Sequence, residues 1–106
     1  MAIVSSDDST FANDLSAHPF TIVKYFADWC GSCKLFAPKY KRLSNDERFQ
    51  HITFLEVNAE TNPEARKMGA VNNLPTFAIF KNGVLVSSVP TSKEEAVVDL
   101  LAQWQS

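Results

Sequence analysis

The stretch Trp29-Cys30-Gly31-Ser32-Cys33 contains both cysteines of the 106-residue chain, with two residues between them. It lies between a strongly apolar run, Phe20 to Ala27, and a run with helical spacing that begins at Cys33. Where a strand gives way to a helix, backbone N–H groups and the positive end of the helix dipole stabilise a thiolate, the reactive form of cysteine. The spacing predicts a thiol–disulfide exchange site, in which the exposed sulfur of Cys30 attacks a disulfide and Cys33 resolves the mixed disulfide.

Other uses of the two cysteines have to be weighed. A structural disulfide that closes so short a loop would add little stability, because loop-closure entropy grows with loop length. A zinc site would need two further ligands, and His18 and His51 stand alone in separate segments. We interpret both histidines as ordinary surface or strand-end residues and expect no metal site. Inert buried cysteines do not fit a place beside glycine and serine at a strand–helix junction.

Length and composition predict one globular domain over residues 1–106. The net charge is −2 with no basic cluster, so nucleic acid is not an expected partner. The apolar start, Met1 to Val4, is too short for a signal peptide, and no stretch approaches the length that spans a membrane. We expect a monomer in the cytoplasm, where thiols stay reduced.

On the N-terminal side of the cysteines, the pattern predicts a strand, a helix and a second strand. Ala2 to Ser5 is the expected edge strand, and Ser9 the expected N-cap of a short helix that ends at His18-Pro19. Phe20 to Ala27 is apolar on both alternating rows, which is typical of a central strand covered on both faces.

On the C-terminal side, the helix from Cys33 contains Pro38, which should kink it. His51 to Val57 predicts a second long strand, parallel to the first. Asn62-Pro63 is the expected cap and first residue of a short helix that ends near Gly69.

The last third of the chain predicts a hairpin and a final helix. Asn82-Gly83 separates the apolar runs Phe77 to Phe80 and Val84 to Val89, a strong hairpin signal. Ser92 with Glu95 predicts a capping box. The helix that follows has one apolar stripe, made of Val97, Leu100, Leu101 and Trp104.

The chain resembles the thioredoxin family over its whole length. The residues that carry the resemblance are Phe26 to Lys34, Ala37-Pro38, Val57-Asn58, Asn62-Pro63, Leu74-Pro75-Thr76 and Phe80 to Gly83. It implies an α/β fold of the thioredoxin type, a central five-stranded mixed sheet flanked by four helices, with a cis Leu74–Pro75 bond. It also implies a protein-disulfide reductase that carries electrons in cell redox homeostasis, needs no cofactor of its own, and is recharged by a flavin-containing, NADPH-dependent thioredoxin reductase.

The resemblance further implies a docking surface for disulfide-containing protein substrates. In thioredoxin-like proteins the cis-proline lies against the disulfide, and the backbone before it pairs with the substrate. The positions that match here are Trp29, Gly31, Ser32, Asn73, Leu74, Pro75 and Thr76. For Trp29 the alternative is an ordinary packed aromatic.

Departures from the family pattern predict differences in potential and in substrate choice. Ser32 stands where most thioredoxins have proline, and a hydroxyl close to the thiols should favour the reduced form, which makes a milder reductant. Asn73 stands where glycine is common, and the Val89-Pro90-Thr91 loop is shorter than usual and lacks its glycine. Both positions should lie on the docking rim.

A further departure concerns charge beneath the dithiol. The family usually has a buried aspartate at the position of Lys24, thought to handle the proton of the resolving cysteine, and often a lysine at that of Glu56. Either charge would be costly to bury alone, so we predict a charge-reversed pair. Our hypothesis is that Glu56 takes the proton of Cys33, directly or through water, and that Lys24 favours the thiolate. The alternative is a purely structural pair.

Two other functions stay open beside the reductase. The dithiol could serve a milder disulfide oxidant or isomerase, which a reduction potential would distinguish. Alternatively, the fold could serve as a docking subunit in which turnover is incidental.

Overall fold

The computed structural model describes residues 3–104 and confirms the predicted order of strands and helices. One 3₁₀ helix, η1, is added between the second helix and the third strand. The elements are β1 Val4–Ser5, α1 Phe11–Ser16, β2 Phe20–Phe26, α2 Gly31–Ser44, η1 Glu47–Phe49, β3 Thr53–Asn58, α3 Pro63–Met68, β4 Thr76–Lys81, β5 Val84–Pro90 and α4 Glu94–Ala102. Of the predicted edge strand, Ala2 lies outside the described residues.

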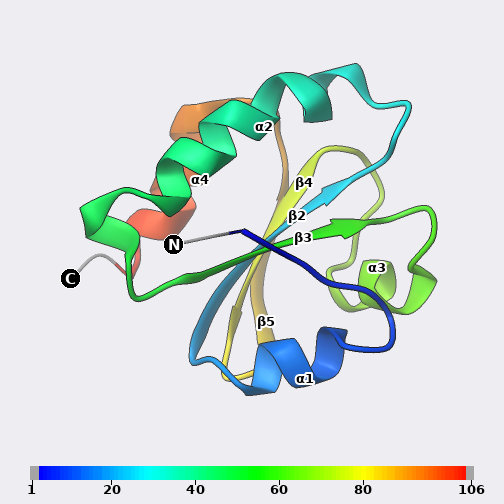
Figure 1. Ribbon diagram of the computed structural model, residues 1–106, viewed down its shortest axis with the longest axis horizontal. Helices are drawn as coiled ribbons and strands as arrows, with labels where there is room; N and C mark the ends of the chain where they lie inside the picture. The colour runs from blue at the N-terminus through cyan, green and yellow to red at the C-terminus, as the bar shows by residue number, and fades with distance from the viewer. Residues whose placement is uncertain (1–2, 105–106) are drawn as a thin grey trace.

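The five strands form one mixed sheet in the order β1-β3-β2-β4-β5. β3 is parallel to β1 and β2, and β4 is antiparallel to β2 and β5, as predicted. At the hairpin, Asn82 and Gly83 have φ of 51° and 83°, the left-handed conformation that a tight two-residue turn requires. α2 and α4 cover one face of the sheet and α1 and α3 the other (Figure 1).

The sheet separates two hydrophobic cores, and β2 contributes to both because successive strand residues face opposite sides. Ile22 lies in the core that α2 and α4 cover, whereas Val23 and Tyr25 lie in the core of α1 and α3. Lys24 therefore points to the α2 side. Lys24, the charged residue in an otherwise apolar row of β2, thus lies on the same side of the sheet as α2, the helix that begins at the cysteines.

Several strand ends differ by one residue from the sequence prediction, and the starts of α2 and β3 each differ by two. α2 begins at Gly31 rather than Cys33, because Cys30 is its N-cap. β3 begins at Thr53 rather than His51, because the chain is still turning after η1, where the Ile52 N–H donates to the carbonyl of Phe49. α2 continues through Pro38 as a single helix, and its predicted kink stays a prediction.

The predicted cap of α1 is wrong. Thr10, not Ser9, precedes this helix, and neither side chain caps it. The Asp7 carboxylate instead accepts from the N–H groups of Ser9 and Thr10, at 2.9 and 3.1 Å. These two hydrogen bonds form a turn over residues 7–10, immediately before the first residue of α1.

The predicted cap of α4 is also wrong. α4 begins at Glu94 with Lys93 in the cap position and no capping side chain, so Ser92 and Glu95 form no capping box. The Thr91 hydroxyl instead accepts from the Lys93 N–H at 3.0 Å. In α1 and in α4 alike, a side chain that precedes the helix accepts from a backbone N–H in the turn before it, and no side chain caps the helix as predicted.

Asn62 occupies the N-cap position of α3 with Pro63 after it, as predicted, but its side chain does not cap the helix. The cap comes from Asp8, whose carboxylate accepts from the N–H groups of Glu64 and Ala65 at 3.2 and 2.8 Å. In return the Asp8 N–H donates to Asn62 Oδ1 at 2.9 Å. This reciprocal contact ties the loop before α1 to the start of α3.

Replacing Asp8 with alanine should lower the free energy of unfolding by about 1–2 kcal/mol, because two N–H donors of α3 lose their acceptor. Urea unfolding followed by circular dichroism measures the change. Glu60→Ala is the matched control, since it removes an exposed carboxylate from the preceding loop. Equal stability of the two variants would show that Asp8 does not cap α3.

α3 ends at Met68 with Gly69 as its C-cap, as predicted, but glycine is needed there for space rather than for backbone conformation. Gly69 has a φ of −89°, and Ala70 takes the positive φ of 55°. A Cβ at Gly69 would lie 2.5 Å from the hydroxyl oxygen of Tyr25. That hydroxyl donates to the Ala65 carbonyl at 2.8 Å and so fastens α3 to the sheet.

The apolar stripe of the last helix packs as predicted for Val97, Leu100 and Leu101, which are buried. Trp104 lies just beyond the end of α4, and its ring packs against Phe20 with 4.9 Å between the centroids. Within residues 3–104, no helix combines the length and apolar character needed to cross a bilayer.

Candidate active site

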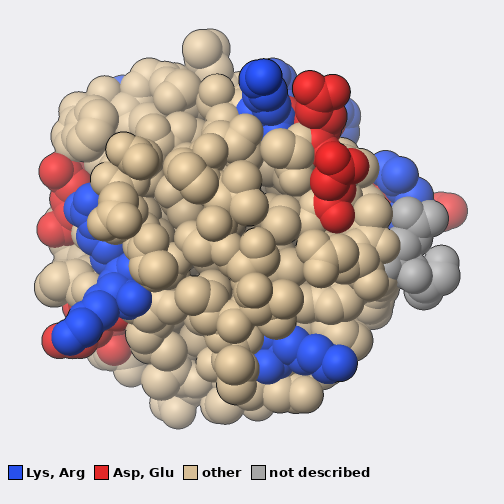
Figure 2. Space-filling model, turned by 180° about the vertical axis from the view of Figure 1, so that it is seen from behind, with Lys and Arg blue, Asp and Glu red and all other residues tan. Residues whose placement is uncertain are grey.

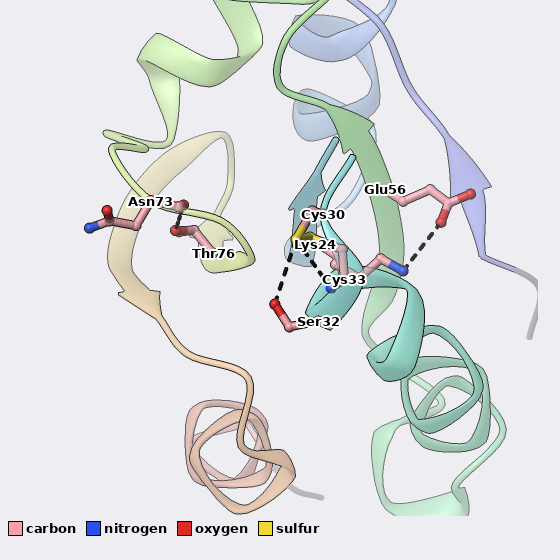
Figure 3. Close-up of a disulfide and its surroundings, with 7 residues drawn as sticks. All are labelled: Lys24, Cys30, Ser32, Cys33, Glu56, Asn73 and Thr76. Atoms are coloured by element: carbon pink, nitrogen blue, oxygen red, sulfur yellow. Dashed lines mark hydrogen bonds and ion pairs between the residues drawn. A yellow bond between two sulfur atoms is a disulfide. The ribbon is translucent and has the colours of Figure 1, made fainter. Parts of the chain in front are cut away.

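Cys30 and Cys33 form a disulfide at the start of α2, with 5.3 Å between their Cα atoms (Figure 3). Cys30 occupies the N-cap position, and its sulfur accepts from the Cys33 N–H at 3.2 Å. After reduction, the same N–H and the helix dipole stabilise a thiolate at Cys30. The site therefore has the electrostatics that a sulfur nucleophile needs.

Ser32 lies beside the first sulfur, as predicted. Its hydroxyl oxygen is 3.6 Å from Cys30 Sγ, and both are labelled in Figure 3. Gly31 opens the helix, and a Cβ there would meet nothing within 4 Å. The surface above Gly31 thus leaves room for another chain to approach the disulfide.

The expectation of an exposed Cys30 sulfur is wrong for the oxidised protein. Cys30 and Cys33 are each only 3% exposed and form a small cluster with Ala27, against which Phe26 and Leu74 pack. Leu74 comes from a distant part of the chain, so this cover could not be read from the cysteine motif. In the oxidised protein only a small part of each cysteine is therefore in contact with solvent.

The histidines do not join the sulfurs. His18 is exposed at the end of α1, and His51 contacts the Trp104 carbonyl and the ring of Phe20. Within the described part of the chain, no three His, Cys, Asp or Glu side chains gather closely enough to hold a metal ion.

The loop before β4 faces the disulfide with the cis Leu74–Pro75 bond that the resemblance implied. The Thr76 hydroxyl donates to the Asn73 carbonyl at 2.5 Å, and the Thr91 N–H donates to the Pro75 carbonyl at 3.2 Å. These bonds hold the loop against the end of β5. A groove of about 400 Å³ results, lined by Ser32, Asn73, Leu74, Pro75, Pro90, Thr91 and Ser92.

Trp29 is 67% exposed beside the disulfide, so the alternative of a packed aromatic is wrong. Leu35 is 76% exposed one helical turn after Ser32. Sequence reasoning missed Leu35, although its spacing from Ser32 on the helix could have placed it on the same side. Trp29 precedes the disulfide and Leu35 follows it in α2, so each offers an exposed apolar side chain close to the cysteines in sequence.

The predicted pairing of Lys24 with Glu56 is confirmed. The two residues are register partners on β2 and β3, and Lys24 Nζ lies 3.8 Å from Glu56 Oε2, the separation of an ion pair (Figure 3). The Lys24 side chain is 5% exposed, but that of Glu56 is 30% exposed and also accepts from the Ser5 hydroxyl at 3.1 Å. The expectation that both charges are buried is therefore wrong for Glu56, because β1 covers it only in part.

The Lys24 ammonium also lies over two aromatic rings, 5.7 Å from the centroid of Phe26 and 5.4 Å from that of Tyr40. Burial lowers the pKa of Lys24, and the Glu56 carboxylate opposes part of that shift. Tyr40 holds its ring in place through its hydroxyl, which lies 2.8 Å from the Leu55 carbonyl and 3.2 Å from that of Ile22. Sequence reasoning missed Tyr40, whose role depends on the packing of α2 against the sheet.

A cavity of about 290 Å³ connects this pair with the second sulfur. Its lining includes Lys24, Glu56 and Cys33, together with Phe26, Ala27, Asp28, Lys34 and Ala37. The pair thus lies next to Cys33, on the side of the cysteines away from Asn73 and Thr76 (Figure 3). Asp28 and Lys34 are exposed at its mouth and were not singled out from the sequence.

Comparisons with known proteins agree with this geometry. The sequence model of the family described as Thioredoxin matches residues 2–103. A thioredoxin of Mycobacterium tuberculosis is 33% identical over 98 residues, which cover 92% of this chain and 84% of that protein. A solved thioredoxin structure from Plasmodium falciparum superimposes with a TM-score of 0.88 at 26% identity and covers 96% of this chain and 99% of that chain.

Other relatives are much longer proteins. The chain spans 21% of a bifunctional thioredoxin reductase/thioredoxin of Mycobacterium leprae, to which it is 32% identical. It spans 14% of a peptide-N(4)-(N-acetyl-beta-glucosaminyl)asparagine amidase of Caenorhabditis briggsae, at 35% identity. The matched region thus occurs both alone and as one part of larger chains.

The fold and the disulfide at the start of α2 define a thiol–disulfide oxidoreductase of the thioredoxin type. The chain belongs to the thioredoxin family.

Replacing Ser32 with alanine should make the reduction potential more negative by roughly 20 mV, because the thiolate loses a hydrogen bond of about 1 kcal/mol. Equilibration with a glutathione or dithiothreitol buffer, followed through the change in tryptophan fluorescence, gives the potential. Ser16→Ala, which removes a hydroxyl on α1, is the control and should leave it unchanged. A potential equal to that of the parent would show that the Ser32 hydroxyl does not stabilise the reduced form.

Proposed function

We propose that this protein is a protein-disulfide reductase that carries electrons in cell redox homeostasis, with Cys30 as the nucleophile and Cys33 as the resolving thiol. The observation that carries the proposal is the position of Cys30 as N-cap of α2, with the Cys33 N–H aimed at its sulfur and the groove of Pro75 beside it. Within residues 3–104, a helix N–H donates to the sulfur of Cys30 and none donates to that of Cys33, which supports different roles for the two cysteines.

The exchange proceeds in two displacements. The Cys30 thiolate attacks one sulfur of a substrate disulfide, a bond forms between those sulfurs, and the other substrate sulfur leaves and takes a proton. Cys33, once deprotonated, then attacks the Cys30 sulfur, which restores the Cys30–Cys33 disulfide and releases the second substrate thiol. Two electrons pass to the substrate.

Substrate proteins dock, in this proposal, against Trp29 and the loop from Asn73 to Thr76. Within residues 3–104 the backbone N–H and carbonyl of Leu74 make no hydrogen bond, so both are available to an extended substrate segment. Pro75 holds this segment next to the sulfurs, and the open space above Gly31 admits it.

Glu56 and Lys24 act on the second displacement through the cavity they share with Cys33. Glu56, half-buried and open to solvent on one side, accepts the proton of Cys33 directly or through water. The Lys24 ammonium favours the Cys33 thiolate by charge. The position of both groups beside the resolving sulfur supports this assignment.

The electron donor we propose is an NADPH-dependent thioredoxin reductase with a flavin. The Mycobacterium leprae relative, named as a bifunctional thioredoxin reductase/thioredoxin, supports this choice. A reducing compartment such as the cytoplasm suits a dithiol that must be returned to its reduced state.

Insulin reduction tests the proposal. The parent protein, supplied with NADPH and a thioredoxin reductase or with dithiothreitol, should accelerate precipitation of the insulin chains. No acceleration by either donor would overturn the reductase. The Ser32 hydroxyl favours a second candidate, a milder oxidant or isomerase, and a reduction potential close to those of isomerases would select it.

A further inference from the structure

Charged side chains are scarce on one part of the surface next to the disulfide. From Met68 to Ser92, Lys81 is the one charged residue. This stretch forms the loop before β4, the β4–β5 hairpin and the start of the connection to α4. Seen from the side opposite that of Figure 1, the molecule presents a broad uncharged face with Lys, Arg, Asp and Glu gathered toward its margins (Figure 2).

A second depression continues the groove of Pro75 away from the sulfurs. Its volume is about 230 Å³, and its lining consists of Ala70, Asn72, Asn73, Thr76, Ser88 and Pro90. Asn73 and Pro90 also line the groove that begins at Ser32, so the two depressions meet at these residues. A substrate segment bound along the groove can therefore continue directly into the second depression.

The Asn73 side chain belongs to this second depression rather than to the disulfide. In Figure 3 it points away from Cys30, while its backbone carbonyl accepts from the Thr76 hydroxyl. The amides of Asn72 and Asn73 and the hydroxyl of Ser88 are thus the polar groups available to an occupant. Amides and hydroxyls both donate and accept hydrogen bonds, which matches a neutral polar side chain.

A charged occupant would lose hydration without meeting an opposite charge in this lining. Cations lie close to it, because Arg66 and Lys67 of α3 line an adjoining depression that shares Ala70 and Asn72. A lysine or arginine in the depression would therefore be repelled as well as dehydrated. An acidic side chain would be penalised less.

We infer that this depression is a side-chain subsite for the substrate protein, one that takes a neutral hydrogen-bonding residue near the attacked cysteine and rejects a basic one. The inference rests on the proposed function, since the occupant is the segment that flanks the disulfide under attack. Its substrate class is disulfide-containing protein segments with Asn, Gln, Ser or Thr at one position beside the cysteine.

Short disulfide-linked peptides test the subsite. Each peptide has one flanking position, taken in turn, occupied by Gln, Glu or Lys, and kcat/KM for reduction is measured with dithiothreitol as the donor. We expect one position at which Lys lowers kcat/KM roughly tenfold relative to Gln, with a smaller loss for Glu. The result is read as the ratio of kcat/KM between two peptides, and the overall activity of the protein cancels in this ratio.

The variant Ser88→Asp sharpens the test, because it places a carboxylate in the depression on an edge strand that tolerates it. At the position found above, the preference should reverse, with Lys reduced faster than Gln. Ser87→Asp is the matched control, since its side chain leaves the opposite face of β5, and it should keep the preference of the parent. Equal rates for all peptides, or a reversal in both variants, would overturn the subsite alone. Failure to reduce any peptide would overturn the proposed function and the subsite with it.

Discussion

Replacing Cys33 with serine is expected to turn the protein from a catalyst into a trap. The Cys30 thiolate keeps its N–H donor and its place at the helix start, so it still attacks a substrate disulfide. Without the second thiol, the mixed disulfide persists. Turnover of insulin should fall by about a thousandfold or more, the scale on which loss of a covalent partner acts.

The Cys30→Ser variant should lose the same turnover but form no mixed disulfide, because within residues 3–104 a helix N–H donates to the sulfur of Cys30 and none donates to that of Cys33. Incubation of both variants with oxidised insulin, followed by non-reducing gel electrophoresis and mass spectrometry, separates the outcomes. An adduct on Cys33 in the Cys30→Ser protein, at a rate equal to that of the Cys33→Ser protein, would reverse the two roles.

Removing Glu56 should cost more stability than removing Lys24, although they belong to one ion pair. Glu56→Gln leaves an ammonium that is 5% exposed without its counter-charge, and we expect a loss of about 2 kcal/mol, below the range for fully buried pairs because Glu56 is 30% exposed. Lys24→Met keeps the volume and removes the charge, while the Glu56 carboxylate still reaches solvent and Ser5. Its stability should equal or exceed that of the parent.

The double variant completes the cycle. Lys24→Met with Glu56→Gln should regain most of the stability that Glu56→Gln lost, since no buried charge is left unpaired. Urea unfolding of the four proteins measures the coupling. Additive losses would show that the pair does not interact in the folded protein.

The pH dependence of stability gives an independent check of Lys24. Because burial depresses its folded-state pKa below the ordinary 10.5, the folded protein binds fewer protons at this site than the unfolded chain. The free energy of unfolding contributed by Lys24 therefore rises with pH, from the folded-state pKa up to 10.5. In Glu56→Gln the rise should begin at a lower pH, and in Lys24→Met it should be absent. The contribution of Tyr25 is common to all the proteins and cancels in the differences, whereas the raised pKa of Tyr40 depends in part on the Glu56 charge and cancels only between the parent and Lys24→Met.

The same two variants decide between proton handling and a structural pair. If Glu56 accepts the Cys33 proton, the pH profile of disulfide reduction shifts in Glu56→Gln, and if Lys24 favours the thiolate, it shifts in Lys24→Met. Profiles identical to that of the parent would leave the pair a structural role only.

Sequence reasoning succeeded where a local pattern or the strand register decides the outcome. The alternating pattern along β2 and β3 showed one charged residue in an apolar row of each strand. In the parallel register of the two strands, Lys24 lies opposite Glu56. The hairpin at Asn82-Gly83 follows from the backbone freedom of these two residues. The exposure of Trp29 was expected only through the resemblance, because it has no local signature in the sequence.

Contacts between distant segments account for the failures. The cap of α3 comes from Asp8, more than fifty residues earlier in the chain, so inspection of the helix start could not reveal it. The burial of Cys30 depends on Leu74, which reaches it only after the sheet has formed. The exposure of Glu56 depends on how little of β3 the short strand β1 covers.

Lys24 and Glu56 are directly opposite each other in the strand register, but their surroundings differ. β2 is a central strand and β3 has only the two-residue β1 beyond it, so exchanging the two residues would bury the carboxylate and expose the amine. In the present arrangement the Lys24 side chain is 5% exposed and its ammonium has little contact with water, whereas the Glu56 side chain is 30% exposed and its carboxylate reaches solvent. Topology thus decides which of the two positions is buried, and the residue at position 24 decides the sign of the buried charge.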